Sequence, residues 1–420
     1  MDIEFLGGAG EIGRSAILLG GDDGTLLLDF GMSTDNPPRL PLDCDPDAVV
    51  VSHGHLDHAG ALPALLSGDA RPSVHWTAPT RELATTLARD TLKLHGGSYR
   101  CPFTRTDLAR LTQVSETHEY GEPFSAAGFE VTLLAAGHIP GSAHVLIEDG
   151  DTRLLYSGDF HTDSQRLVSK TTARPDADLV ICESTYSDVT HEPRDEVERR
   201  FAESVRTTLW EGGTVVVPAF AIGRTQEMLL ICAEYDIPCY VDGMGKEVTR
   251  MLRRHPEFVR DPEAFDRAVS HARFVTGQDG QRKRIARQNA AIVTTSGMLS
   301  GGPAMTYIPE IRGNPTNKVA MTGYQVEGTP GRELLETGSA EIDGRVMPVA
   351  ARIESYDFSA HADREGVLEF LAAYENTPIL VNHGDRCGAF AAELREKGYE
   401  ASAPERGETI TVPSSTRARR

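Results

Sequence analysis

The densest set of potential metal ligands lies in six consecutive residues, His53 to His58, which read His-Gly-His-Leu-Asp-His. The apolar segment 47–52 precedes them and predicts a short buried strand. At a strand end the backbone leaves the sheet, so neighbouring side chains can turn towards one point. Two imidazoles can then serve one ion, and a carboxylate with a third imidazole can serve a second. These ligands suit a hydrolytic zinc, and also manganese or iron. A histidine-rich loop without metal does not explain why so many ligands follow an apolar strand.

Three later segments repeat the same order of an apolar strand, then small residues, then a potential ligand. The three are His138 after strand 131–134, Asp159 after strand 153–156 and His383 after strand 378–381. Asp159 has two carboxylate oxygens and could bridge two ions. A single histidine of this kind is more often a structural polar residue, but the shared pattern favours metal ligands.

The remaining histidines do not share this pattern clearly. We expect six of them to be structural or exposed: His75, His95, His118, His191, His255 and His271. His144 and His161 lie near the predicted ligands in sequence and could support them.

The elements that must position these ligands follow from the hydrophobic pattern. Residues 1–30 predict paired strands, and strands then alternate with helices to about residue 185. A charged helix is expected over 194–210 and a buried strand over 214–218. Such alternation predicts a parallel sheet in the middle of the chain.

A G-x-G-x-x-G pattern at Gly8–Gly13, with Asp29 about twenty residues later, has the residue types and spacing of a dinucleotide-binding fingerprint. That fold requires a helix after the glycines. Here residues 14–19 lead into a Gly-Gly-Asp-Asp-Gly turn and another apolar strand, which is the pattern of a hairpin. We therefore expect a tight glycine loop that borders the metal site.

Bulk composition indicates a globular protein. A length of 420 residues suggests two or three domains, and 40% of the residues are hydrophobic. Apolar runs are too short to span a membrane, and the N-terminus has no targeting signal, so we expect a cytoplasmic protein with no membrane partner. The six cysteines are scattered without a Cys-x-x-Cys pair, as expected of buried thiols in a reducing compartment.

The net charge of −20 would repel nucleic acid in dilute salt. Only six of the 42 basic residues are lysines. An acidic, lysine-poor surface is expected of a protein that works in very high salt, where the Debye length falls to ~3 Å or less and global repulsion hardly acts. An ordinary acidic enzyme that never meets a polyanion is the alternative, and charge alone does not decide between them.

Taken together, these motifs resemble those of the metallo-β-lactamase superfamily. Asp29, the 53–58 segment, His138 and Asp159 correspond to its first four motifs. Three further residues resemble motifs A, B and C of the β-CASP ribonuclease family within it. They are Glu183, His361 and His383.

Other segments are similar to the nuclease subunit of the cleavage and polyadenylation specificity factor and its archaeal relatives. They are 218–224, 296–298, 301–303 and 323–332. Longer archaeal relatives carry RNA-binding KH domains ahead of this core. The chain starts directly on its first strand, so we expect the short form without KH domains.

The resemblance implies an α/β fold, with an αββα sandwich interrupted by an inserted α/β β-CASP domain. The first part of the metallo-β-lactamase domain would cover 1–189, the β-CASP domain 190–347, and the return segment with motifs B and C 348–420. The active site is expected between the two domains.

The resemblance also implies a metal-dependent ribonuclease that hydrolyses RNA phosphodiester bonds, as an endonuclease, a 5′-3′ exonuclease or both. Its role would lie in mRNA 3′-end processing, RNA maturation or decay. Two zinc ions are expected, with manganese as an alternative, and a homodimer is possible.

The ligand sets implied are as follows. His53, His55, His138 and Asp159 would hold one ion, and Asp57, His58, Asp159 and His383 the other.

Catalytic and supporting roles are implied in the same way. Asp57 would orient the attacking water and take its proton. His361 would protonate the departing oxygen, and Glu183 would keep that imidazole charged. Asp29 would orient the ligands from behind. The insert would supply weaker contacts to phosphate from Arg224, Arg332, Gly301 and Gly302.

Three other functions agree less well with these residues. A small-molecule hydrolase such as a glyoxalase or lactonase could use the first four motifs, but would need neither the insert nor His361. A DNA-processing β-CASP enzyme typically lacks a histidine at the position of His383. An inactive scaffold subunit would not be expected to retain every ligand.

Overall fold

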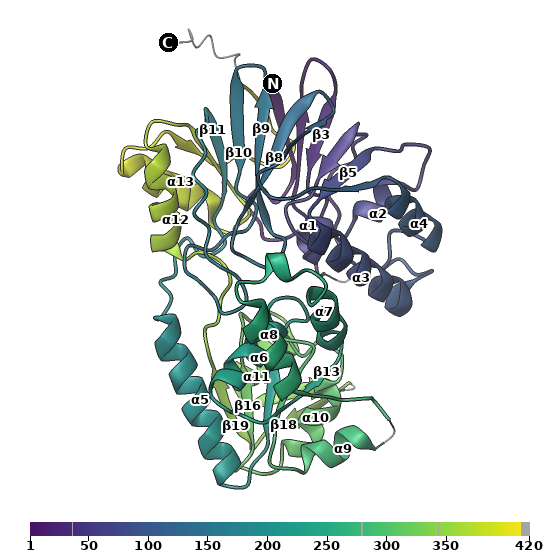
Figure 1. Ribbon diagram of the computed structural model, residues 1–420, viewed down its shortest axis with the longest axis vertical. Coiled ribbons are helices and arrows are strands. Elements are labelled where there is room, and N and C mark those ends of the chain that lie inside the picture. The colour runs from purple at the N-terminus through teal and green to yellow at the C-terminus, as the bar shows by residue number, and fades with distance from the viewer. Residues whose placement is uncertain (36, 279, 343, 413–420) are drawn as a thin grey trace. The chain divides into compact units, whose positions relative to one another are not determined.

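The computed structural model describes residues 1–35, 37–278, 280–342 and 344–412. The chain forms two compact units. Unit 1 contains Met1–Ser164, Lys170–Thr190 and the chain from Ala360 onwards, and unit 2 contains Gln165–Ser169 and His191–Ser359. In Figure 1 unit 1 carries the purple, blue and yellow parts of the ribbon, and unit 2 the teal and green parts.

Unit 1 contains two seven-stranded sheets. The first has the order β22-β1-β2-β3-β4-β5-β6. Its strands are β1 (Asp2–Gly7), β2 (Ala16–Gly20), β3 (Thr25–Leu28), β4 (Ala48–Val50), β5 (Ser73–Trp76), β6 (Ser115–Thr117) and β22 (Thr409–Thr411). Strands β1 to β3 form an antiparallel meander, and β3 to β6 pair in parallel. The carboxyl ends of β3, β4 and β5 therefore meet at one edge.

The second sheet has the order β21-β20-β11-β10-β9-β8-β7. Its strands are β7 (Pro123–Ala126), β8 (Phe129–Ala135), β9 (Ala143–Asp149), β10 (Thr152–Tyr156), β11 (Leu179–Glu183), β20 (Ile379–Asn382) and β21 (Ala401–Ser402). Strands β10, β11 and β20 run parallel to one another, although β20 comes from the far side of unit 2 in sequence. The site residues that follow these strands are brought to one end of the sheet in this way.

The two sheets pack face to face, and helices cover their outer faces. Alternate strand residues such as Phe5 and Val131 form one core between the sheets. On the outer side of the first sheet, Trp76 packs with apolar residues of α3 and α4, and on that of the second, Val180 packs with those of α12 and α13. The helices of unit 1 are α1 (Leu56–Ala59), α2 (Leu62–Leu65), α3 (Ala78–His95), α4 (Arg105–Gln113), α12 (Arg364–Leu371) and α13 (Cys387–Glu396). This is the predicted αββα sandwich, and Figure 1 shows its two helical layers.

Unit 2 is built on a six-stranded sheet in which every pairing is parallel, as the strand–helix alternation predicts. The strand order is β14-β13-β15-β12-β16-β19. The strands are β12 (Val215–Pro218), β13 (Cys239–Asp242), β14 (Arg273–Phe274), β15 (Ala291–Thr294), β16 (Lys318–Met321) and β19 (Arg352–Ser355), with a separate hairpin of β17 (Ser339–Ile342) and β18 (Arg345–Pro348). The helices are α5 (Arg194–Trp210), α6 (Arg224–Glu234), α7 (Gly245–Leu252), α8 (Pro262–His271), α9 (Gln281–Ala286), α10 (Ala304–Ile311) and α11 (Pro330–Thr337).

Unit 2 includes β19, which follows residue 348, the return point that the resemblance implies. Strand β19 pairs with β16 and completes the edge of the six-stranded sheet. Arg352 also donates hydrogen bonds to Thr208 Oγ1 and to the carbonyl of Thr316, both within unit 2. The compact unit consequently ends at Ser359.

The glycine pattern at Gly8–Gly13 connects two antiparallel strands, β1 and β2. The chain thus forms the hairpin expected from the sequence where a dinucleotide-binding fold would place a helix. The carbonyl of Gly8 accepts a hydrogen bond from the backbone of His383 at 2.8 Å, so this loop does border a predicted ligand. No helix within the described residues is long and apolar enough to cross a membrane.

Candidate metal centre

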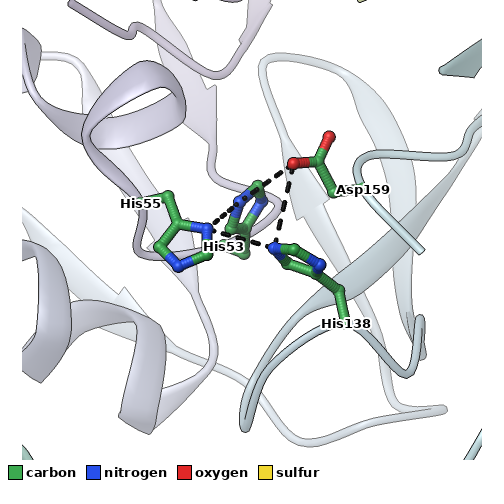
Figure 2. Close-up of side chains that lie close together, drawn as sticks. All are labelled: His53, His55, His138 and Asp159. Atoms are coloured by element: carbon green, nitrogen blue, oxygen red, sulfur yellow. Dashed lines mark hydrogen bonds and ion pairs between the residues drawn. The ribbon is translucent and has the colours of Figure 1, made fainter. Parts of the chain in front are cut away.

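Three imidazoles and one carboxylate from distant parts of unit 1 converge on one point (Figure 2). His53 and His55 follow β4, His138 follows β8, and Asp159 follows β10. The facing atoms are His53 Nε2, His55 Nδ1 and His138 Nε2. His55 Nδ1 lies 3.2 Å from the His53 nitrogen and 3.0 Å from that of His138. Asp159 Oδ2 lies 3.5 Å from His53 Nε2 and 3.9 Å from His138 Nε2.

These separations fit one small cation. Four ligands at ~2.0–2.1 Å from a tetrahedral zinc would be ~3.3–3.4 Å apart. The nitrogen–nitrogen separations fall slightly below this value and the nitrogen–oxygen separations slightly above it. Without a cation, lone pairs of these ring nitrogens would face one another at 3.0–3.2 Å, which is unfavourable. The donor set is therefore suited to a divalent ion.

A second set lies beside the first and shares Asp159. Asp159 Oδ1 lies 3.3 Å from His58 Nε2 and 3.6 Å from His383 Nε2. His383 Nε2 is also 3.7 Å from Asp57 Oδ2. Within the described part of the chain, Asp159 Oδ1 and the two Nε2 atoms are buried and have no hydrogen-bond partner. Buried polar atoms normally have partners, so three such atoms that face one space form a second group able to hold a cation.

Hydrogen bonds to the ring nitrogens that point away from the centre fix the orientation of several of these imidazoles. Asp29 is fully buried and accepts four hydrogen bonds, from the backbone and hydroxyl of Ser52, both at 2.7 Å, from Tyr156 Oη at 2.8 Å and from His58 Nδ1 at 2.7 Å. Since a carboxylate only accepts, His58 carries its proton on Nδ1 and presents Nε2 to the centre.

The same arrangement recurs at two other ligands. His138 Nδ1 donates to the carbonyl of Ala360 at 2.9 Å, and His383 Nδ1 lies 2.8 Å from Ser15 Oγ. In each case the nitrogen opposite the centre is occupied, which leaves Nε2 for the centre. His383 has a φ of +49°, a left-handed conformation that is unusual for a residue other than glycine. Backbone hydrogen bonds to Gly8 and from Ser184 hold His383 in this conformation, directly after the end of β20.

Burial shapes the charge state of the imidazoles. It lowers the pKa of His53 and His138 well below the ordinary value, and that of His55 to about 4, with neighbouring imidazoles acting in the same direction. For His58 burial also disfavours the charged form, but the carboxylates of Asp159 and Asp29 outweigh it and raise its pKa. The imidazoles of His53, His55 and His138 are therefore neutral and offer the free lone pairs that a metal ion requires.

A carboxylate–imidazole pair lies next to the first ligand set. Glu183, at the end of β11, accepts hydrogen bonds from the backbone of Phe160 and Thr185, and both its oxygens are 3.3 Å from His361 Nδ1. Burial lowers the pKa of His361, but Glu183 and then Asp159 more than compensate and raise it to about 9. His361 is therefore protonated at neutral pH, and its ring lies 4.5 Å from that of His138.

The four predicted phosphate contacts belong to unit 2. Arg224 begins α6 and is buried. Arg332 in α11 is exposed and pairs with Glu336 at 2.6 Å. Gly301 and Gly302 have positive φ angles in the loop before α10, and a side chain on Gly302 would meet the carbonyl of Thr295 at 2.7 Å. The ion pair with Glu336 gives Arg332 a structural role, and the close approach to Thr295 explains why residue 302 is a glycine. Neither observation requires a contact with phosphate.

Of the two histidines expected from the sequence to support the ligands, His144 has another role. The sequence also did not point to several residues that do support them. His144 uses both ring nitrogens on Ser157 O and Thr171 Oγ1, so it stabilises the loop after β10 and does not contact the ligands. Ser52, Tyr156 and Ser15 support the centre, but a lone hydroxyl has no distinctive pattern. Only the position of Ser52 directly before His53 could have drawn attention to it.

A fold of two sheets between helices, with histidines and carboxylates from strand ends at one edge, defines a metallohydrolase. Family models agree: the metallo-beta-lactamase superfamily matches residues 9–181, the Beta-Casp domain matches 225–334, and the Zn-dependent metallo-hydrolase RNA specificity domain matches 346–404. The chain belongs to the metallo-β-lactamase superfamily, in its β-CASP branch with the archaeal relatives of the cleavage and polyadenylation specificity factor.

Three curated relatives support this assignment. "RNase aCSPSF2" of Saccharolobus solfataricus is 34% identical over 98% of this chain and 85% of its own length. "Probable RNase MJ4" of Methanocaldococcus jannaschii is 32% identical over 98% of this chain and 100% of its own. "Transcription termination factor FttA" of Pyrococcus horikoshii is 32% identical, over 98% and 71% respectively.

A solved structure shares the fold. A protein of unknown function from Enterococcus faecalis V583 matches with a TM-score of 0.63 and 13% identity, over 98% of this chain and 99% of that one.

Proposed function

We propose that this protein is a metal-dependent ribonuclease that hydrolyses phosphodiester bonds in RNA. The observation that carries the proposal is a pair of ligand sets that share Asp159, with the protonated His361 beside them. Two cations and an adjacent acid together can catalyse phosphodiester hydrolysis. Two full-length relatives are named as ribonucleases, and a family model for an RNA specificity domain matches the end of the chain.

The proposed ligands are those predicted from the sequence. The first set is His53, His55, His138 and Asp159, and the second is Asp57, His58, Asp159 and His383. Bound divalent ions supply charge stabilisation for the phosphate and lower the pKa of water towards ~7. We propose zinc, with manganese as the alternative, because nitrogen and oxygen ligands accept both.

The side chains of the protein would move the protons. Asp57 lies at the edge of the second set, 3.7 Å from His383 Nε2, where its carboxylate can orient the attacking water and accept its proton. His361 donates a proton to the oxygen that leaves. Glu183 keeps His361 protonated, and its own two hydrogen bonds from the backbone hold that carboxylate in place.

Further aspects of the proposal rest on the family and on composition. We propose that the first unit is the metallo-β-lactamase domain and the second the β-CASP domain, and that Arg224, Arg332, Gly301 and Gly302 contact the RNA backbone. Endonucleolytic cleavage, 5′-3′ exonucleolytic cleavage or both would serve mRNA 3′-end processing, RNA maturation or decay.

A cytoplasmic location agrees with six cysteines that form no disulfide. The −20 charge and scarcity of lysine favour a high-salt cytoplasm, and a homodimer is proposed from the family alone.

The test is cleavage of end-labelled RNA in high salt, with and without a chelator. We expect cleavage that the chelator abolishes and that Zn²⁺ or Mn²⁺ restores. Matched single-stranded DNA and a thioester distinguish the DNA-processing and small-molecule alternatives. The same RNA with a 5′ monophosphate or a 5′ triphosphate, and a map of the fragments, separates end-directed from internal cutting. Hydrolysis of the thioester but not of RNA would contradict the proposal.

A further inference from the structure

A second group of metal-binding side chains lies in unit 1 away from the centre described above. It consists of His75 in β5, Glu116 in β6 and His118 just after β6. Strand β6 ends the first sheet, and β5 and β6 pair in parallel with His75 opposite Glu116. Side chains at paired positions of neighbouring strands point to the same side of a sheet, so the register itself brings this imidazole and this carboxylate together.

The two imidazoles face each other through single nitrogens. His75 Nδ1 lies 2.9 Å from His118 Nε2, and the same His75 nitrogen is 3.9 Å from Glu116 Oε2. Two ligands at ~2.0–2.1 Å from a zinc ion would be ~2.8–3.4 Å apart for angles from 90° to tetrahedral, so the nitrogens already have a suitable spacing. The Glu116 side chain is 61% exposed and can close the remaining gap by a change of rotamer.

The surroundings hold both rings in place. The outer nitrogen of His75, Nε2, lies 2.8 Å from Ser73 Oγ, the kind of partner that orients a metal-binding imidazole. The ring of His118 stacks on Phe124 of β7, with centroids 3.6 Å apart and planes 8° apart. Strand β7 ends the second sheet, so the group lies where the edges of both sheets meet.

Charge and access also suit a cation. Burial lowers the pKa of His75 to about 4 and also lowers that of His118, so both rings are neutral at pH 7 and can offer lone pairs. The carboxylates of Glu116 and Glu122 act on His118 in the opposite direction and leave the local charge negative. An exposed carboxylate gives an ion a way in from solvent.

We propose that His75, Glu116 and His118 form a third metal site, for a divalent transition-metal ion, at the edge of the sandwich. Two imidazoles and one carboxylate favour zinc and similar ions over magnesium and calcium, which prefer oxygen ligands alone. The three ligands leave coordination positions for water. The ion would link β6, a strand of three residues at a sheet edge, to its neighbour β5 and so stabilise the edge.

The test is the metal content of the full chain after stripping, reloading with Zn²⁺ and removal of excess ion. We expect His118→Ala to bind one Zn²⁺ per chain fewer than the unchanged protein. Glu116→Gln alters an exposed side chain that the fold does not need, and should weaken binding at this site at least ~10-fold. His95→Ala, at the end of α3 and outside every ligand group, is the matched control and should lose no Zn²⁺.

Two further measurements make the result decisive. Zn²⁺ should raise the melting temperature of the unchanged protein more than that of His118→Ala, because only the former gains a link between β5 and β6. RNA cleavage by His118→Ala and Glu116→Gln should stay unchanged, which separates this site from the centre proposed for catalysis. Equal Zn²⁺ content in the unchanged protein and in both variants would overturn the proposal and leave a simple hydrogen bond between the two imidazoles.

Discussion

The substitution Asp29→Asn should show how much metal binding depends on a residue that orients the candidate ligand His58 by a hydrogen bond. Asn has nearly the same shape as Asp and tolerates the left-handed conformation of this residue, whose φ is +59°. Its Oδ1 can still accept from the backbone of Ser52. The other oxygen becomes an amide that donates, and it faces the Ser52 and Tyr156 hydroxyls and His58 Nδ1.

The main effect should fall on His58. With an amide donor in place of the carboxylate, Nδ1 must accept, and the ring proton moves to Nε2. That nitrogen faces Asp159 and His383 and could then bind a cation only after it loses this proton. Loss of such a supporting partner costs about 10- to 100-fold in metal affinity, or ~1.4–2.7 kcal/mol.

Stability should fall as well, but not enough to unfold the protein. Charge-assisted hydrogen bonds contribute ~1.5–3 kcal/mol each, and the two hydroxyls can rotate to accept from the amide. We expect a loss of about 2 to 4 kcal/mol from a total on the order of 5–15 kcal/mol.

The assay is competition with a calibrated chelator, read together with the far-ultraviolet circular dichroism spectrum and RNA cleavage. We expect a native spectrum, one weakened metal and slower cleavage. Asp107→Asn is the control, because it removes a buried carboxylate that caps α4 away from the centre and should lower stability without changing metal affinity. Unchanged affinity for both ions in Asp29→Asn would refute the role assigned to this carboxylate.

Other changes should produce distinct results. His361→Ala should keep its metal while cleavage falls about 10²- to 10⁴-fold, and unchanged cleavage would remove His361 from the mechanism. Asp159→Ala should lose metal and activity together, because one carboxylate serves both sets; full metal content by elemental analysis would contradict this. Burial lowers the pKa of His361, but Glu183, Asp159 and Asp57 outweigh burial and raise this pKa to about 9. Cleavage should therefore decline as the pH rises through about 9, because the acid loses its proton there. Glu183→Gln should move this decline to lower pH, and an unmoved pH profile would count against the pair.

The convergence of the candidate ligands was largely predictable because these residues obey a local rule. His138, Asp159 and His383 each follow an apolar strand, and the parallel pairing of β10, β11 and β20 brings such strand ends together. A strand end and a polar residue can be recognised from a few neighbouring positions. The antiparallel connection after the glycines at Gly8–Gly13 was predictable for the same reason.

What the sequence did not reveal depends on pairing between distant segments. His75 and His118 looked like unrelated structural histidines because nothing local indicates that β5 and β6 pair in this register. The role of Asp29 as a fourfold acceptor needs Tyr156, which lies in the other sheet. The membership of β19 in the sheet of unit 2 is not evident from the sequence, because this strand is short and partly polar and its place is decided by hydrogen bonds to β16.

The order of the centre's residues along the chain has a consequence during synthesis. The segment that carries His53, His138 and Asp159 is translated first, but His361 and His383 follow the whole of unit 2. An emerging polypeptide would therefore lack the proposed acid, His361, and the proposed ligand, His383, until unit 2 has been translated. The ribosome that makes this protein works on the kind of molecule that the product is proposed to cut, and the unfinished chain would lack two of the groups proposed for that cleavage.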